Sequence, residues 1–162
     1  MKLLSLLFLI IAVPVSAQHV DCTSKQITIT GSVKSNKTIE LKALDSMKTV
    51  ALSDFTITNH KGEVKRTMTG LQGIALKDIL QQAEINVESP KQLSEFYIVF
   101  TACDGYKVVY SWNEIFNSAT GNNIYLIKEK NGENISSITT SDNMTGRRYV
   151  QGLSTITINR IQ

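Results

Sequence analysis

The residues best suited to chemistry lie in the stretch Cys103-Asp104-Gly105-Tyr106, where one of only two cysteines stands beside a carboxylate and a phenol. A cysteine acts as a nucleophile or metal ligand only as a thiolate, and among its sequence neighbours only Lys107 could lower its pKa. The Asp-Gly pair favours a tight two-residue hairpin turn, because both residue types tolerate positive φ angles. The stretch therefore predicts a hairpin that carries a structural cysteine rather than a reactive thiol.

Other polar side chains are candidates for binding rather than catalysis. Arg147 and Arg148 carry forked guanidinium donors that match the oxygens of a phosphate, although strand alternation would turn only one of them inward. A solvated strand edge is the alternative for this pair. The Tyr106 hydroxyl could face a cleft, or the ring could be half core and half surface. His19 and His60 are too far apart, without acidic neighbours at ligand spacing, to indicate a metal site.

Several function classes have no support in the sequence. It contains no Gly-x-Ser-x-Gly elbow, no phosphate-binding glycine loop and no prominent carboxylate pair. The formal charge of +3 falls to +2 once Lys2 is removed with the leader described below, and acidic and basic residues are interspersed. Hydrolase, nucleotide-binding and nucleic-acid-binding functions are therefore not predicted.

The first 17 residues have the pattern of a secretory signal peptide. Lys2 precedes an apolar run over 3–15, and Ser16-Ala17 places small residues where a signal peptidase would cut. The run is shorter than the roughly 20 apolar residues that a membrane span requires. Cys22 lies too far beyond Ala17 for a lipoprotein box. We predict cleavage after Ala17, no membrane span after that cleavage, and a secreted or periplasmic protein with a single domain over 18–162.

An oxidising compartment would allow the two cysteines to pair. A bond between Cys22 and Cys103 would tie the N-terminal arm to a hairpin, but the sequence does not show whether the two sulfurs come within bonding distance. A shielded free thiol at Cys103 therefore stays open as the alternative.

Hydrophobic periodicity places the candidate residues on short strands and helices. Strands are predicted at 26–33, 55–58, 63–69, 96–102, 107–110, 124–128, 147–150 and 155–161. A short helix capped by Thr38 is predicted, a second over 76–83, and a third begins at a capping box formed by Ser111 and Glu114. The segment 96–102 is apolar on both faces, which predicts a central strand covered on two sides.

The helices fall between groups of strands without regular βαβ alternation. This order predicts an α+β domain with a mixed, mainly antiparallel sheet and a few short helices.

Three stretches, in this order, resemble the molybdopterin-binding domain of sulfite-oxidase-like oxidoreductases. They are residues 69–80 (TGLQGIALKDIL), residues 102–106 (ACDGY), and residues 146–150 (GRRYV) followed by 153–158 (LSTITI). A weaker match, NGE at 131–133, lies in the expected place. Each motif is common by itself, so their order and spacing carry the resemblance, which covers most of the chain from about Gln26.

The resemblance implies a secreted domain with the sulfite-oxidase molybdenum-domain fold but not the chemistry, so the cofactor stays unknown, with molybdopterin as the candidate from the family. In competent members a cysteine thiolate ligates molybdenum after the strand that precedes the first matched stretch. Here that region, 55–62, reads FTITNHKG, and Asn59 or His60 stands where the cysteine is expected. Cys103, which lies on a different hairpin, is a weak substitute because the family usually has a small residue there.

From this resemblance, the predicted cofactor-binding residues are Asn59, His60, Tyr106, Arg147 and Arg148, with no catalytic or metal-binding residue. The first hypothesis is a domain that binds an anionic or pterin-type ligand without standard turnover. The second is an active molybdopterin-dependent oxidoreductase in which Cys103 or another group serves the cofactor. The third is a non-enzymatic module that binds a partner protein in the periplasm.

Overall fold

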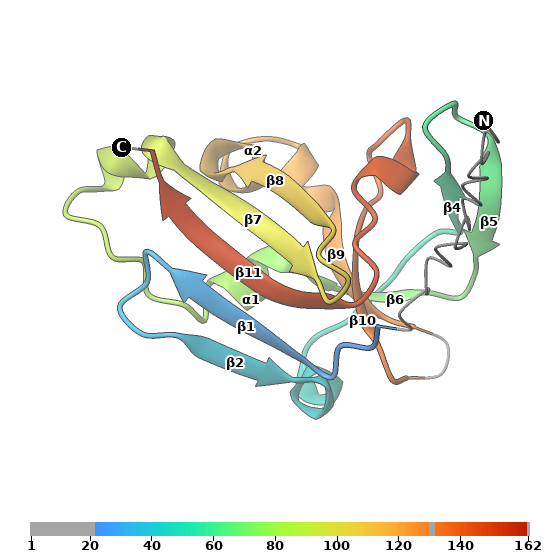
Figure 1. Ribbon diagram of the computed structural model, residues 1–162, viewed down its shortest axis with the longest axis horizontal. Coiled ribbons are helices and arrows are strands. Elements are labelled where there is room, and N and C mark those ends of the chain that lie inside the picture. Colours follow the sequence, from blue (N-terminus) through green and yellow to red (C-terminus); the bar gives the residue numbers. More distant parts are fainter. Residues whose placement is uncertain (1–21, 130–131, 162) are drawn as a thin grey trace, which may run out of the picture.

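The chain folds into three β-sheets with a few short helices, which confirms the predicted α+β class with mixed, mainly antiparallel pairing. The computed structural model describes residues 22–129 and 132–161, so the predicted signal peptide lies outside the described residues. In Figure 1 the hairpin of β4 and β5 stands apart from the largest sheet, and β6, β9 and β10 run between the two.

The largest sheet has five strands in the order β2-β1-β11-β7-β8. These are β2 (Lys37–Glu40), β1 (Gln26–Gly31), β11 (Leu153–Arg160), β7 (Phe96–Ala102) and β8 (Lys107–Ser111). β1 pairs with β11 in parallel, and the other pairs are antiparallel. Alternate residues of β7 are fully buried and the others are half-buried, so only one face of this strand is completely covered. The prediction of two covered faces was therefore wrong.

The second sheet has four antiparallel strands and lies inside the molecule. Its strands are β10 (Ile135–Thr139), β9 (Ile124–Lys128), β6 (Gln72–Ala75) and β3 (Val50–Ala51). Ile124 and Leu126 of β9 pack into the core against the five-stranded sheet, whereas Ile127 and Ile138 pack into a second core. The sheet therefore supplies side chains to two separate cores, one from each face.

The third sheet is the hairpin of β4 (Phe55–Thr58) and β5 (Val64–Met68), both predicted from the sequence. Phe55, Ile57 and Met68 point inward and form the second core together with Leu71, Ile127 and Ile138. Burial of a large apolar side chain stabilises a fold by about 1.5–3 kcal/mol, so this small core attaches the hairpin firmly.

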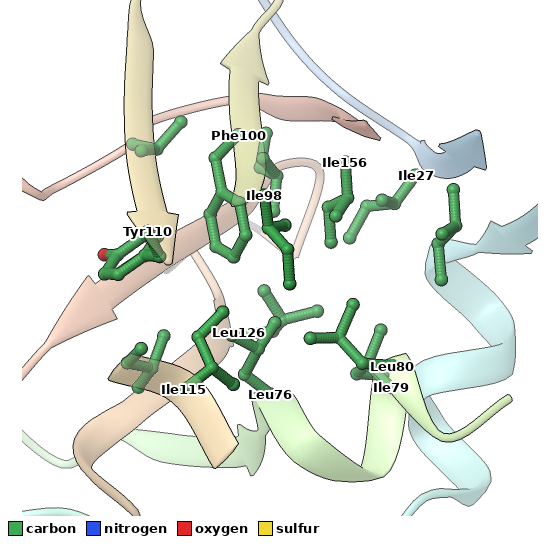
Figure 2. Packing of buried hydrophobic residues seen from close by; sticks show 14 of the residues in the cluster. Ile27, Leu76, Ile79, Leu80, Ile98, Phe100, Tyr110, Ile115, Leu126 and Ile156 are labelled. Atoms are coloured by element: carbon green, nitrogen blue, oxygen red, sulfur yellow. The ribbon is translucent and has the colours of Figure 1, made fainter. Parts of the chain in front are cut away.

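Short helices cover the main core. The α-helices are α1 (Leu76–Leu80) and α2 (Trp112–Phe116); the 3₁₀ helices are η1 (Leu41–Ser46), η2 (Pro90–Glu95), η3 (Thr120–Asn123) and η4 (Thr145–Arg147). Figure 2 shows Leu76, Ile79 and Ile115 facing Ile98 and Phe100 across this core. The predicted apolar face of the helix at 76–83 is thus confirmed, although the helix itself has only five residues.

Two predicted elements were wrong. Thr38 does not cap a helix, because it lies in β2 and pairs with Thr28, and η1 begins after Glu40. Residues 147–150 do not form a strand: η4 occupies their first position, and only Val150 forms an isolated bridge, to Ser137. The arginine pair therefore sits on a turn held by side chains rather than on a ladder of backbone hydrogen bonds.

The turn between β7 and β8 has three residues rather than two. Ala102 donates its N–H to the Tyr106 carbonyl oxygen at 2.9 Å, and Gly105 N–H reaches back to the Ala102 oxygen at 3.0 Å. Only Gly105 has a positive φ, of 88°, and Asp104 instead accepts a hydrogen bond from the Tyr106 N–H at 2.9 Å. Ala102, not Cys103, therefore lies opposite Tyr106, and Cys103 projects from the hairpin tip.

Candidate functional site

Tyr106 and Arg147, two of the predicted binding residues, meet where the β7–β8 hairpin contacts η4. The Tyr106 hydroxyl donates a hydrogen bond to the Arg147 carbonyl oxygen at 2.6 Å. The Tyr106 ring remains 42% exposed, and the Arg147 side chain is also exposed. In the described part of the chain, no ion pair engages the Arg147 guanidinium. Its donors are therefore available to a ligand.

The end of β4 packs directly against η4. The Thr145 hydroxyl accepts a hydrogen bond from the Thr58 N–H at 3.2 Å and donates one to the Thr56 carbonyl oxygen. A Cβ atom added at Gly146 would lie 1.9 Å from the Thr58 carbonyl oxygen, so only glycine permits this approach. The Thr145 hydroxyl thus makes hydrogen bonds that a neighbouring strand would otherwise make along the outer edge of β4. It joins the β4–β5 hairpin to the turn at 145–148, which we call the arginine turn.

Asn59 and His60 lie on that β4–β5 turn, close in sequence to Thr58. The Asn59 Oδ1 atom accepts hydrogen bonds from the N–H groups of Lys61 and Glu63, at 2.9 and 3.0 Å. Its Nδ2 group donates to a Glu63 carboxylate oxygen at 2.7 Å. The Asn59 side chain therefore builds the turn, whereas His60 is exposed at the turn.

Arg148 is the half-buried member of the arginine pair, and carboxylates engage its guanidinium. The Nε group donates to Asp142 at 2.6 Å, and the terminal nitrogens pair with Asp142 and Glu114. Its central carbon lies 5.0 Å from the centroid of the Tyr110 ring, a cation–π contact. The hydrogen bonds that the guanidinium donates to Asp142, and next those to Glu114, raise the Arg148 pKa above its usual range. Arg148 therefore fixes the turn and leaves Arg147 to face solvent.

The two cysteines form a disulfide, with their Cα atoms 5.6 Å apart. This confirms the bonded alternative for Cys22 and Cys103. The Cys103 N–H also donates to the Gly152 carbonyl oxygen at 2.9 Å, which joins the hairpin tip to the chain just before β11. Because the chain has only these two cysteines, no thiolate remains to ligate molybdenum. The residues present do not fit the metal centre that the resemblance implies.

Local sequence patterns did not predict the partners of the arginine turn, residues 145–148. Ser111 does cap α2, accepting a hydrogen bond from the Glu114 N–H at 3.0 Å, but the Glu114 side chain pairs with Arg148 instead of completing a capping box. Tyr110, which is fully buried under the Arg148 guanidinium, forms a hydrogen bond with the Thr139 hydroxyl at 2.8 Å. These contacts join residues up to 34 positions apart, which local sequence patterns do not reveal.

Burial raises the pKa of Tyr110 to about 12 from an ordinary value of 10.0. Between these two pH values the unfolded chain releases the phenol proton and the folded chain retains it. The contribution of neutral Tyr110 to stability is therefore complete below pH 10 and is lost as the pH rises through 12. We expect the ionisation of Tyr110 to lower the free energy of unfolding by roughly 3 kcal/mol over this interval.

Urea unfolding at a series of alkaline pH values tests this expectation. The variant Tyr110→Phe should lose about half of the pH dependence that the wild-type protein shows between pH 10 and 12. The rest should remain, because burial also raises the pKa of Tyr149 above its usual range. Identical slopes for the variant and the wild type would contradict the assignment to Tyr110.

Other features bear on metal and membrane functions. Within residues 22–129 and 132–161, no three His, Cys, Asp or Glu side chains gather in a way that could hold a metal ion. Across the same residues, no helix is both long and apolar enough to span a bilayer.

No family model matches this chain, and no curated protein matches it. Among solved structures, the sulfane dehydrogenase SoxCD from Paracoccus pantotrophus is similar, with a TM-score of 0.53 and 11% sequence identity. The match covers 83% of this chain but 38% of that one, so this chain spans well under half of its length. At this identity the likeness concerns the fold alone. The chain therefore has a fold that also occurs as part of a dehydrogenase.

Proposed function

We propose that this protein is a secreted or periplasmic domain, like the sulfite-oxidase-type molybdenum domain in fold, that binds a small anionic or pterin-type ligand without molybdenum-dependent turnover. The exposed Arg147, in a chain whose only two thiols form a disulfide, is the observation that carries this proposal. The fold shared with part of a dehydrogenase supports the proposed fold. The ordered motifs support the proposed resemblance to the sulfite-oxidase-like family.

The proposed binding surface is centred on Arg147. Arg147 offers a forked set of N–H donors, and the Tyr106 ring beside it provides an exposed aromatic surface. On the β4–β5 turn, the exposed residues His60 and Lys61 follow Thr58, which contacts Gly146, and we assign them to the same surface. Guanidinium and ammonium groups together favour a phosphate, a sulfate or another oxyanion. We assign Asn59 and Arg148 a supporting role, because their polar atoms are already bonded within the protein.

An NMR titration with inorganic phosphate and with sulfite tests the surface. Amide signals of Arg147, Tyr106 and the β4–β5 turn should shift together and saturate. The variant Arg147→Ala should weaken binding roughly tenfold or more, because a charge-assisted hydrogen bond contributes about 1.5–3 kcal/mol. Arg160→Ala is the matched control: Arg160 is exposed at the far end of β11 and pairs with Glu95, so its removal should leave binding unchanged. Equal losses in both variants would refute the assigned site.

Elemental analysis separates this proposal from an active molybdenum enzyme. The mature protein, purified from a host that makes molybdopterin, should contain molybdenum at far less than one atom per chain. Stoichiometric molybdenum would overturn the proposal and revive Cys103, or another group, as a ligand. The variant Cys103→Ser should then lose that metal, whereas under our proposal it has none to lose.

A further inference from the structure

Strand β5 has one unpaired edge. It pairs with β4 along its other edge, and in the described part of the chain no strand lies against it there. Its first four residues, 64–67, are exposed. Backbone N–H and C=O groups at such an edge can pair with another chain, and charged side chains commonly guard them. Lys65 and Arg66 provide such charges here.

A cavity of about 270 Å³ lies beside this edge. It is lined by Arg66, Thr67 and Met68 of β5, and by Leu71, Ile127, Lys128 and Glu129 from the facing layer. Consecutive residues of a strand point to opposite faces. Arg66 and Met68 share the face of β5 toward Glu129 and the second core, and Thr67 between them also lines the cavity, so we place the cavity at the edge of β5 that β4 leaves free. The cavity is thus placed next to the unpaired backbone of β5.

A larger cavity of about 390 Å³ adjoins the first, and the two share the lining residues Leu71, Ile127, Lys128 and Glu129. The larger cavity reaches Leu44 and Asp45 of η1. We call the two adjacent cavities the β5 groove. Its lining combines aliphatic and polar side chains, a mixture that suits alternate apolar and polar groups of a bound chain.

The charges around the β5 groove are unequally exposed. The Glu129 carboxylate is only 14% exposed, and it accepts hydrogen bonds from the hydroxyls of Ser136 and Tyr149. Burial and Glu129 raise the Tyr149 pKa above its usual range, so this phenol remains a neutral donor. The Arg66 guanidinium, 46% exposed, donates to the Tyr149 hydroxyl and lies 3.8 Å from Glu129.

Lys128, at the centre of the β5 groove, pairs with Asp45 and is neutralised there. On the strand itself, Lys65 and Arg66 are exposed, and the 64–68 segment contains no carboxylate. Arg66 is paired with Glu129, whereas no ion pair in the described part of the chain engages Lys65, so Lys65 adds positive charge to the edge beside the aliphatic side chains of the β5 groove.

We propose that the outer edge of β5 is a docking site for an extended segment of a partner protein in which acidic and apolar residues alternate. The segment would add a strand to the β4–β5 hairpin, as in β-strand addition to other exposed edges. Its apolar side chains would enter the β5 groove over Leu71 and Ile127, on the face of β5 that carries Arg66, and its carboxylates would lie on the opposite face, beside Lys65. A second copy of this chain is a poor occupant, because edge-to-edge pairing would oppose like charges on the two β5 strands.

An NMR titration with a synthetic probe tests this inference. The probe is an amidated nonapeptide in which glutamate and leucine alternate, added at low ionic strength to the isotopically labelled mature protein. Amide signals of β5 and of the β5 groove should shift and saturate. The matching nonapeptide of alternating lysine and leucine should produce no saturable shift. Failure of the acidic peptide to bind, or equal binding of both peptides, would overturn the proposal.

Two charge-reversed variants sharpen the test. Lys65→Glu should weaken binding of the acidic peptide about fivefold or more, because it replaces a favourable exposed pair by a repulsive one. Lys91→Glu makes the same charge change on η2, outside the β5 groove, and should leave binding unchanged. Equal effects of the two variants would show general charge attraction instead of a site. Shifts at β5 that depend on protein concentration without peptide would instead indicate a second copy and overturn the assigned occupant.

Discussion

Replacing both cysteines by serine, as Cys22→Ser with Cys103→Ser, is expected to lower the free energy of unfolding by about 4 kcal/mol. The bond joins residues 81 positions apart, and a cross-link over a long loop removes much conformational freedom from the unfolded chain. Gly152 packs against both sulfurs, since a Cβ atom added there would lie 2.6 Å from the Cys103 sulfur and 3.2 Å from that of Cys22. The bond therefore also holds the β7–β8 tip against the start of β11.

Urea unfolding of the oxidised protein, the reduced protein and the double variant measures this effect. The reduced protein and the double variant should have similar stabilities, and adding reductant to the double variant should change nothing. Hydrogen exchange should rise first at residues 22–24, which the bond holds in place, and around Gly152, which packs against the two sulfurs. A loss below about 1 kcal/mol would show that hydrogen bonds alone hold these segments together.

The strands and helices that the sequence predicted correctly are those whose pattern is local. Alternation over β1 and β4, and the threefold and fourfold spacing of Leu76, Ile79 and Leu80, result from backbone geometry that neighbouring residues determine. Strand β10 was missed because its sequence ISSIT reads as polar, yet all five residues are buried. One of its serines donates a hydrogen bond to the half-buried Glu129, a partner that only the tertiary structure provides.

The residues of the candidate site stay a prediction, and the sequence did not indicate the contacts that they make in the structure. Tyr106 and Arg147 meet as expected of a shared surface, but they do so through the Arg147 carbonyl group rather than the guanidinium. The prediction that one arginine would turn inward described Arg148 correctly for an incorrect reason, because these residues form a turn and not a strand. Strand alternation could not distinguish the two, since carboxylates brought together by the fold select Arg148.

The prediction of a structural cysteine at Cys103 is confirmed, but the sequence did not distinguish a disulfide from a shielded free thiol. The choice between them depends on where the N-terminal arm lies. In the structure the Ser24 N–H donates to the Asn134 side chain at 2.7 Å, and Ile135 N–H donates to the Ser24 oxygen at 3.1 Å. These bonds place the arm, and with it Cys22, beside the hairpin tip.

The variant Arg148→Met should lower the free energy of unfolding by about 3 kcal/mol, the second large effect that we expect. Methionine retains much of the aliphatic volume but leaves Asp142, whose side chain is only 13% exposed, without its guanidinium partner. Glu114 loses the same partner, and Tyr110 loses the cation over its ring. Removing one member of a largely shielded ion pair costs more than the pair contributes, because the remaining charge stays desolvated.

Urea unfolding at neutral pH measures the loss, and Arg160→Met is the matched control. Arg160 pairs with Glu95 at 2.6 Å, but both side chains are more than 40% exposed, so this variant should lose less than about 1 kcal/mol. Arg148→Lys should give an intermediate value, because an ammonium group keeps the charge but cannot reach both carboxylates with a forked geometry. Equal losses in the free energy of unfolding for Arg148→Met and Arg160→Met would show that solvent screens the Arg148 ion pairs. The contacts of Thr145 and Gly146 would then hold the turn that presents Arg147.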